Sequence, residues 1–402
     1  MTAKTRYVAR QDADLASWTI GIKRTELQEM LSVVERPGIL SFALGLPDPA
    51  LFPVQEFAEA TSYILKRDRH ALQYGPPFAP LKEHIVKLMA EHGVRCNEEQ
   101  VFLTTGAQQG MNLLTHLLLD PGGEVLVEGM AYTGFLQALE PFKPRILTVP
   151  TNPETGIDPD AVEYLLEQGT RPAFMYVIAD GHNPLAVSID MSTRLRLVEL
   201  ARQYRVPIVE DDVYGFLNYN EERLPPLRAL DDQWVYYVGS FSKILAPSLR
   251  VGWVIVPQNL QTPLSIVKES SDINTSTFTQ RIVSAYLDTG NLGSHISILR
   301  REYRNRRDTM LHSLRQQFYS IARWHEPSAG VFVWVEFTSP VDTGKLLKVA
   351  IEREHVAYIP GQVFSVGGRW PAANSLRLNF SCCNQGLIEE GIHRLAQVFR
   401  FV

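Results

Sequence analysis

The sequence predicts an α/β protein with a mostly parallel, mixed sheet between helices, followed by a smaller α+β domain. Short apolar runs alternate with helical stretches through the middle of the chain, which is typical of a parallel sheet covered on both faces. That alternation weakens after about residue 290, where a long helical stretch begins. The length of 402 residues exceeds one ordinary core and indicates about two domains.

The first predicted strand covers 100–106, where the run QVFLTTG ends in a turn. A helix follows over 107–120 and ends at Pro121 and Gly122, because proline and glycine interrupt helices. Further apolar runs that end in polar residues predict strands, and one stretch between them has helical spacing. These strands are 122–129, 171–179, 206–212 and 233–242, and the helix is 190–205.

The smaller domain is predicted to contain a helix, a strand, a second helix and a second strand. Their ranges are 291–318, 330–337, 343–355 and 374–383. The first of these helices carries a basic run with acids interspersed, which predicts a solvated helix face rather than a nucleic-acid site. The basic run is Arg301, Arg304, Arg306 and Arg307.

The composition restricts the class of protein. The formal net charge is -5, which gives no general attraction to nucleic acid or to an anionic membrane. The N-terminus lacks the apolar core of a signal peptide, and no window approaches the roughly 20 apolar residues of a membrane span. Cys96, Cys382 and Cys383 have no metal-ligand spacing, which predicts free thiols and no metal. We therefore expect a cytoplasmic protein that binds neither nucleic acid nor membrane.

Polar residues gather where the predicted strands end. The four sequences are TTGAQQG, ADGHNPLA, VEDDVYG and GSFSK. Open parallel sheets bind ligands beyond the carboxyl ends of their strands, so we expect these side chains to converge on one edge.

Two of these ends suit parts of one ligand. In TTGAQQG, Gly106 frees the backbone and the amides of Ala107 and Gln108 open a helix, which can bind a phosphate, although an ordinary strand-to-helix turn has the same pattern. In IVEDD, three consecutive acids must be solvated, paired or bound to a ligand. One carboxylate could hold a protonated ring nitrogen, with a metal site as the other possibility. Tyr214 lies three residues past Asp211 and could donate to the same ligand.

Lys243 follows two small hydroxyl residues and precedes an arginine. Ser240, Ser242 and Arg250 can bind a phosphate by themselves, so Lys243 is available for covalent chemistry. A plain counter-charge to the phosphate is the alternative. A phosphate cradle, an acid for a ring nitrogen, an aromatic side chain and a free lysine together predict a pyridoxal phosphate site.

These motifs resemble the class I/II aminotransferases of the aspartate aminotransferase fold, most of all the branch of 2-aminoadipate, kynurenine and aromatic aminotransferases. The resemblance runs from about residue 22 to 398 and includes LTTGAQQGMNLL, IVEDDVYGFL, GSFSKILAPSLRVGW and LRLNFS. It implies fold type I of the pyridoxal-phosphate-dependent transferases. It also implies an N-terminal segment at 1–50 that joins the small domain and the substrate lid, a large cofactor-binding domain at 51–290 and a small domain at 291–402.

The resemblance implies roles around the cofactor. Lys243 would hold the cofactor as a Schiff base and act as general base, and Asp211 would pair with the protonated ring nitrogen. Tyr132 would stack on the ring, while Tyr214 and Asn183 would hydrogen-bond its hydroxyl oxygen. The phosphate site would consist of Gly106, Ala107, Gln108, Ser240, Ser242 and Arg250.

The resemblance implies further roles around the substrate. Arg377 would bind the α-carboxylate near Asn183, and Gly45 would line the pocket. Tyr74 would reach the phosphate of a neighbouring subunit, which implies a homodimer with shared active sites. Arg24, or the lysine before it, could contact an acidic side chain. A set of aromatic residues could equally line an apolar pocket, namely Trp18, Phe42 and Phe364.

The chain departs from the family pattern around one pocket. The family's N-P-T-G is replaced by a turn in which Leu185 and Ala186 supply neither the hydroxyl nor the glycine. His182, just before this turn, is also unexpected, and it is either a loop histidine with satisfied hydrogen bonds or an additional acid–base group. The other departures are Met130, Ala131, Val213 and Ser248.

We therefore expect an aminotransferase that moves the amino group of an L-amino acid to a 2-oxo acid with ping-pong kinetics. The departures leave an alternative on the same fold: a lyase, cyclase, decarboxylase or oxidase of specialised metabolism. A transcription regulator with an aminotransferase-like domain is a third class, which the charge balance disfavours.

Overall fold

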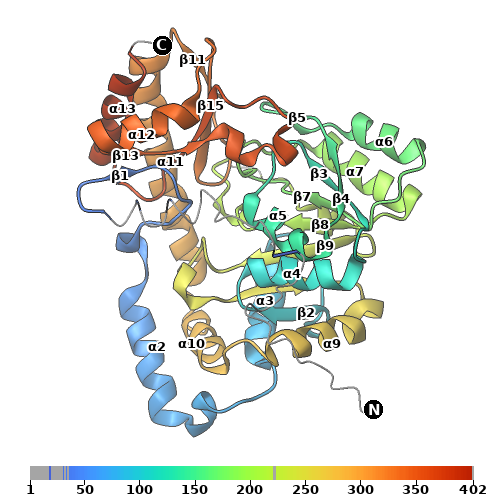
Figure 1. Cartoon of the computed structure of the whole chain (residues 1–402). Helices are drawn as coiled ribbons and strands as arrows, with labels where there is room; N and C mark the ends of the chain where they lie inside the picture. The colour runs from blue at the N-terminus through green and yellow to red at the C-terminus, as the bar shows by residue number, and fades with distance from the viewer. Residues whose placement is uncertain (1–17, 20–29, 31–32, 34–35, 221–222, 401–402) are drawn as a thin grey trace, which may run out of the picture.

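A seven-stranded sheet forms the centre of the larger part of the molecule (Figure 1). The computed structural model describes residues 18–19, 30, 33, 36–220 and 223–400. The strand order is β2, β10, β9, β8, β7, β3, β4, and β10 runs antiparallel to both of its neighbours while the other pairs are parallel. The predicted α/β class with a mostly parallel, mixed sheet is confirmed.

The strands of this sheet are shorter than the apolar runs that predict them. Two strands were not predicted. The first is β10, which directly follows the loop of Lys243 and Arg250, so the sequence does not separate its four residues from that motif. The second is β4, a half-exposed strand at the edge of the sheet. The bounds are β2 Val101–Thr104, β3 Glu124–Glu128, β4 Arg145–Val149, β7 Met175–Val177, β8 Ile208–Asp211, β9 Val235–Ser240 and β10 Gly252–Ile255.

Helices cover both faces of this sheet. Val209 of β8 packs in one core with α4 and α5, and Ile208 packs in another with α6 and α7. Successive residues of a strand point to opposite faces, which places Asp211 on the α4 face and Glu210 on the α7 face. The helices in this part are α2 Val54–Arg67, α3 Ala79–Glu91, α4 Ala107–Leu118, α5 Thr133–Leu139, α6 Pro159–Glu167, α7 Met191–Tyr204, α8 Leu227–Leu230, α9 Gln261–Asp272 and α10 Thr277–Leu287, with a small hairpin of β5 Thr151–Asn152 and β6 Gly156–Ile157.

The C-terminal part has its own four-stranded sheet, in the order β11, β12, β15, β14. A short N-terminal strand, β1, pairs in parallel with β13 of this part. The exact division at 50 and 290 stays a prediction. The elements are β1 Leu40–Ser41, α11 Leu292–Phe318, β11 Ala322–Arg323, β12 Phe332–Phe337, α12 Thr343–Arg353, β13 Val356–Ala357, β14 Ile359–Pro360, β15 Ser375–Asn379 and α13 Gln385–Val398.

The basic run on α11 differs from the prediction of a solvated face. Arg306 and Arg307 are buried and paired, Arg306 with Asp48 at 2.7 Å and Arg307 with Glu326 at 3.0 Å. Arg301 and Arg304 are exposed, as predicted. The alternation of charges along the sequence did not show that the other side of α11 is buried. Within the described ranges, no helix combines the length and apolar character of a membrane span. In the same ranges, no group of His, Cys, Asp and Glu side chains is arranged to bind a metal.

Candidate active site

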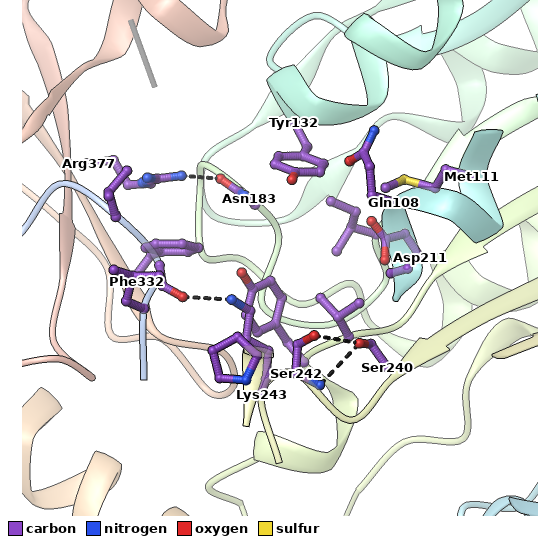
Figure 2. A pocket seen from close by; sticks show the side chains of 18 of the residues that line it. Gln108, Met111, Tyr132, Asn183, Asp211, Ser240, Ser242, Lys243, Phe332 and Arg377 are labelled. Atoms are coloured by element: carbon purple, nitrogen blue, oxygen red, sulfur yellow. Dashed lines mark hydrogen bonds between the residues drawn. The ribbon is translucent and has the colours of Figure 1, made fainter. Parts of the chain in front are cut away.

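A cavity of about 270 Å³ lies at the carboxyl ends of the strands in the large sheet (Figure 2). Loops that follow β2, β3, β7, β8 and β9 contribute to it, and β12 and β15 of the C-terminal sheet close it from the other side. The predicted site residues that line it are Gly45, Ala107, Gln108, Tyr132, Asn183, Asp211, Tyr214, Ser240, Ser242, Lys243, Arg250 and Arg377.

One end of the cavity is built to bind an anion. Gly106 begins α4 at φ 76° and supplies no side-chain cap, so the first amides of α4 remain available. A Cβ on Gly106 would lie 2.5 Å from Arg250 Nη2, so only glycine permits this approach. Arg250 Nη2 donates to the Thr105 carbonyl at 3.0 Å, and Ser240 Oγ donates to Ser242 Oγ at 2.9 Å. Uncapped amides, hydroxyls and a guanidinium together fit a phosphate group.

Asp211 presents an incompletely bonded carboxylate to the middle of the cavity. Its Oδ2 accepts a hydrogen bond from Tyr176 OH at 2.7 Å, whereas its buried Oδ1 has no partner in the described part of the chain. Burial raises the pKa of Asp211 to about 6, and the charge of Asp212 raises it further while the bond from Tyr176 opposes the shift. A buried carboxylate oxygen without a donor is costly, and a protonated ring nitrogen would supply that donor.

Lys243 follows β9 and reaches across the cavity, where its Nζ donates to the Gly45 carbonyl at 2.7 Å (Figure 2). Burial lowers the pKa of Lys243 to about 8, and the positive charges of Arg377 and Arg250 add to this effect. A lysine that loses its proton this readily is a competent nucleophile and base near neutral pH.

Tyr132 and Tyr214 line the same cavity as Lys243 and Asp211. Burial raises the pKa of both phenols, so each keeps its proton and can donate a hydrogen bond. A Cβ on Gly45 would lie 2.7 Å from Phe332 Cζ, so a glycine is required where this segment passes the cavity.

Arg377 lies on β15, 2% exposed, at the opposite wall. Its Nη1 donates to Asn183 Oδ1 at 2.5 Å and its Nη2 to the Ala43 carbonyl at 2.6 Å, while its Nε has no partner in the described residues. The guanidinium carbon lies 4.0 Å from the centroid of the Phe332 ring and 4.8 Å from that of Phe364. Burial lowers the pKa of Arg377 to about 10, and a carboxylate ligand would restore the charge balance.

Some predicted residues lie elsewhere. Tyr74 is 85% exposed and does not reach the cavity of its own chain, and Arg24 lies outside the described residues. Of the aromatic set, Phe42 is part of the core, Trp18 is exposed, and Phe364 supports Arg377 without lining the cavity. His182 is also absent from the lining, although Asn183 beside it is present.

The sequence did not reveal most of the apolar lining or the contact of Tyr176 with Asp211. Tyr176 lies opposite Val209 in the pairing of β7 with β8, and no motif encodes that register. The apolar residues of the lining come from distant segments. Only three of them adjoin a predicted site residue in the sequence: Val213 follows the acidic motif, and Leu44 and Leu46 flank Gly45. The full apolar set is Leu44, Leu46, Met111, Ile178, Val213, Pro247 and Phe332.

Comparisons with known proteins identify the family. The family model for aminotransferase class I and II matches residues 39–395. The chain is 36% identical to aromatic-amino-acid aminotransferase 1 of Thermococcus litoralis, over 95% of this chain and 93% of that protein. It is 37% identical to the 2-aminoadipate transaminase of Thermus thermophilus, over 94% of each chain.

Solved structures agree with the sequence relatives. The structure of Pyrococcus horikoshii kynurenine aminotransferase, in complex with PMP, matches with a TM-score of 0.90 and 34% identity over 96% of each chain. These relatives favour amino-group transfer over the lyase, cyclase, decarboxylase or oxidase alternative. The chain therefore belongs to the class I and II aminotransferases: it is a pyridoxal-phosphate-dependent aminotransferase of fold type I, in the branch of the aromatic, 2-aminoadipate and kynurenine aminotransferases.

Proposed function

We propose that this aminotransferase accepts L-amino acids with a large, mainly apolar side chain and passes their amino group to a 2-oxo acid. The observation that carries the proposal is an apolar wall of the cavity that also contains Arg377. Its members are Leu44, Leu46, Val213, Pro247 and Phe332. Such a wall stabilises an aromatic or long aliphatic side chain by burying its surface. Relatives named for aromatic amino acids and kynurenine support this choice.

The residues of the cavity divide the chemistry among them. Bound pyridoxal phosphate supplies an aldehyde that condenses with amines and a ring that accepts electrons. Lys243 Nζ would hold the cofactor covalently, and the same amine is placed to move a proton at the substrate Cα. The unpartnered oxygen of Asp211 would accept a hydrogen bond from the protonated ring nitrogen. Arg377 binds the substrate carboxylate, with its unpartnered Nε as the available donor.

The pKa of Lys243 suits both of its tasks. At about 8 it leaves a useful fraction of neutral amine near neutral pH, which an ordinary lysine near 10.5 does not. The apolar wall limits the access of water to the reacting carbon, and Tyr132 and Tyr214 stay protonated donors beside it.

We also infer a homodimer in which Tyr74 completes the site of the partner. Tyr74 is 85% exposed and Leu72 is 74% exposed, so both are available for an interface. Tyr74→Phe should keep the dimer and weaken cofactor binding, which light scattering and a cofactor titration would measure. The cytoplasmic location expected from the sequence stays a prediction.

Steady-state kinetics with a panel of donors tests the proposed substrate class. Phenylalanine and kynurenine should give a higher kcat/KM than aspartate, and double-reciprocal plots against the oxo acid should be parallel. Arg377→Lys should raise the KM of donor and acceptor by roughly 10- to 100-fold, because lysine lacks the planar group that Asn183 and the Ala43 carbonyl hold with Nε free for the carboxylate. Many turnovers of one amino acid without any oxo acid would contradict transfer.

A preference for 2-aminoadipate would instead indicate that a lysine or arginine of the enzyme binds the acidic side chain of the substrate. The described residues that line the cavity offer only Lys243, Arg250 and Arg377, which already have roles. Arg24 lies outside the described residues, so Arg24→Gln, compared on phenylalanine and 2-aminoadipate, distinguishes the two substrate classes.

A further inference from the structure

A buried histidine–carboxylate pair lies behind the turn that carries Asn183. His182 Nε2 lies 3.0 Å from Glu128 Oε2, and the two side chains are only 3% and 4% exposed. Glu128 ends β3, and His182 belongs to the loop after β7, the neighbouring strand. Neither side chain lines the cavity. The other oxygen of Glu128, Oε1, is buried and has no hydrogen-bond partner among the described residues. The carboxylate of Glu128 therefore depends on His182 for its contact through Oε2.

The hydrogen bonds of His182 determine which ring nitrogen carries the proton. The backbone N–H of Leu185 donates to His182 Nδ1 at 3.3 Å, so Nδ1 holds no proton. Nε2 then carries the proton and donates it to Glu128. Both nitrogens are occupied, and neither is directed at the cavity. This arrangement argues against His182 as an additional acid–base group at the reacting atoms.

The same residue holds the turn at both ends through its backbone. Its N–H donates to the Val187 carbonyl at 2.8 Å, and its carbonyl accepts from the Ala186 N–H at 2.5 Å. Ala186 has φ 61°, a left-handed conformation that an alanine adopts at a cost. The turn lacks the threonine and glycine usual in the family. Two backbone bonds of residue 182 and the bond from the Leu185 N–H to His182 Nδ1 hold the turn, and only the last of these depends on the histidine side chain.

The turn carries Asn183 and so positions the substrate-binding side of the cavity. Asn183 Oδ1 accepts the bond from Arg377 Nη1, so a shift of the turn moves the partner of that guanidinium (Figure 2). Resting on the function proposed above, we propose that His182, oriented by Glu128, is a positioning residue that sets the place of Asn183 and thereby of Arg377. It acts through the turn and takes no part in proton transfer.

Binding and kinetic measurements on matched variants test this. His182→Phe keeps an aromatic ring and removes both nitrogens. It should weaken binding of the unreactive carboxylate 3-phenylpropanoate about 10- to 100-fold and raise the donor KM similarly, with a smaller loss in kcat. Glu128→Gln should stay within about threefold of wild type, because an amide oxygen still accepts from Nε2–H. Glu128→Leu should resemble His182→Phe.

Ser188→Ala is the matched control in the same loop. Ser188 Oγ accepts from the Gly181 N–H at 3.0 Å, immediately outside the His182–Val187 bond, and this bond does not involve the His182 ring. Its removal should therefore leave 3-phenylpropanoate binding unchanged if the ring of His182 sets the turn. Equal weakening in Ser188→Ala and His182→Phe would show a general loosening of the loop and overturn the proposal. So would a Glu128→Leu protein that binds as tightly as wild type.

A measurement on the unaltered protein covers the case in which His182→Phe fails to fold. In ¹⁵N-histidine NMR, with the His182 signal assigned from His182→Gln, the neutral ring should carry its proton on Nε2 and none on Nδ1. A proton on Nδ1, or a limb of the kcat profile that vanishes in His182→Gln, would overturn the proposal. A wild-type protein without transaminase activity would overturn the proposed function instead, while the tautomer and ligand binding would still report on the turn.

Discussion

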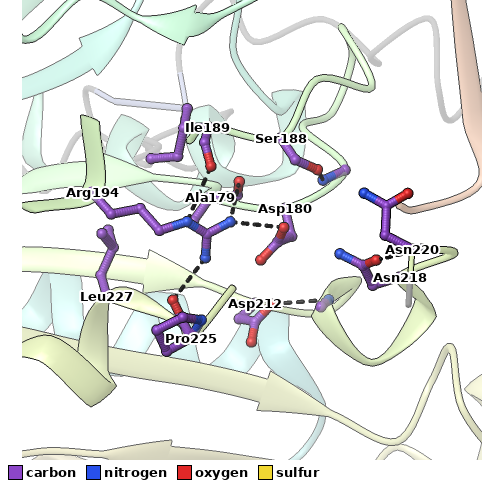
Figure 3. Close-up of polar contacts among 12 residues, drawn as sticks. Ala179, Asp180, Ser188, Ile189, Arg194, Asp212, Asn218, Asn220, Pro225 and Leu227 are labelled. Carbon is purple, nitrogen blue, oxygen red and sulfur yellow. Dashed lines mark hydrogen bonds and ion pairs between the residues drawn. The ribbon is translucent and has the colours of Figure 1, made fainter. Parts of the chain in front are cut away.

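The two aspartates that follow each other at the carboxyl end of β8 have opposite surroundings. Asp211 faces the cavity with one oxygen unpartnered among the described residues. Asp212 faces the other side of the sheet, where His92 Nε2 lies 2.8 Å and Tyr237 OH 2.9 Å from its Oδ2. Its Oδ1 accepts from the Gly215 N–H at 2.9 Å (Figure 3).

This difference separates their titration. Burial raises the pKa of Asp211 to about 6. Burial would raise the pKa of Asp212 as well, but the hydrogen bonds from His92 and Tyr237 and the charge of Arg194 together lower it. Two identical side chains at adjacent positions therefore serve different ends: the satisfied charge stabilises the fold, and the incompletely satisfied one is held ready for a ligand.

The satisfied region also includes Arg194 and Asp180 (Figure 3). Arg194, which is fully buried on α7, pairs with Asp180 at 2.8 Å and donates to the Ile189 and Pro225 carbonyls at 3.1 and 2.9 Å. If the comparison is right, substitutions on the cavity side reduce activity and leave stability nearly unchanged. Substitutions in this network do the reverse.

The largest expected effect is on the cavity side, in Lys243→Ala. Loss of the covalent attachment and of the general base should lower kcat by about 10,000-fold or more. The melting temperature of the cofactor-free protein should change little, because Lys243 is a poorly solvated charge whose removal leaves no carboxylate unpaired. Lys87→Ala, at an exposed position, is the control. Full turnover in Lys243→Ala would make the assignment of the nucleophile wrong.

The next effect is on the network side, in Arg194→Met. The substitution leaves the Asp180 carboxylate, which is 4% exposed, without its ion-pair partner. We expect a loss of about 3–5 kcal/mol in unfolding free energy, seen as a melting temperature lower by roughly 4–6 °C in a chain of this size. The double variant Arg194→Met/Asp180→Asn should recover part of this loss. If Arg194→Met strongly lowered kcat and left the melting temperature unchanged, the distinction between the cavity side and the network side would be wrong.

The pH dependence of stability sharpens the comparison, because Lys243 has a lowered pKa in the folded state. Between about pH 8 and 10.5 the folded cofactor-free protein has released this proton while the unfolded chain still binds it. The unfolding free energy should therefore rise with pH across that window, by about 1–3 kcal/mol for this group. Below pH 8 both states hold the proton and the contribution is constant. Denaturant titrations of wild type and Lys243→Ala at a series of pH values measure this. The two unfolding free energies, plotted against pH, should differ in slope only between about pH 8 and 10.5.

The same division explains what the sequence could predict. Lys243, Asp211 and Arg250 were predictable because they are chemistry-bearing residues at strand ends, and the carboxyl ends of parallel strands share an edge. The partner of Asp211 was not, since Tyr176 is one of several buried aromatics and only the register of β7 against β8 brings it there. The contacts on the network side could not be predicted either, because nothing in the sequence indicates that His92 pairs with Asp212, 120 residues away.

The long strands and helices with clear periodicity were predicted to within a few residues, as for the helix at 291–318, which the structure places at Leu292–Phe318. The short strand β10 was missed because four residues carry too little periodicity to separate them from the adjoining motif. The apolar wall of the cavity was missed for a related reason: an aliphatic residue looks the same in a core and in a pocket.

The smallest expected effect lies on the boundary between the two regions, in Ala186→Gly. Three opposing contributions decide its sign. Relief of the left-handed conformation at φ 61° is worth about 1–2 kcal/mol. Loss of a fully buried methyl costs about 0.8 kcal/mol, and the added freedom of the unfolded chain costs about 0.4–1 kcal/mol. The terms nearly cancel, so denaturant titration should show a change below about 1 kcal/mol. Ala186→Val, which adds bulk at the same strained φ, should lose more than about 2 kcal/mol. A large loss in Ala186→Gly would mean that the methyl group, rather than His182, keeps the turn in place.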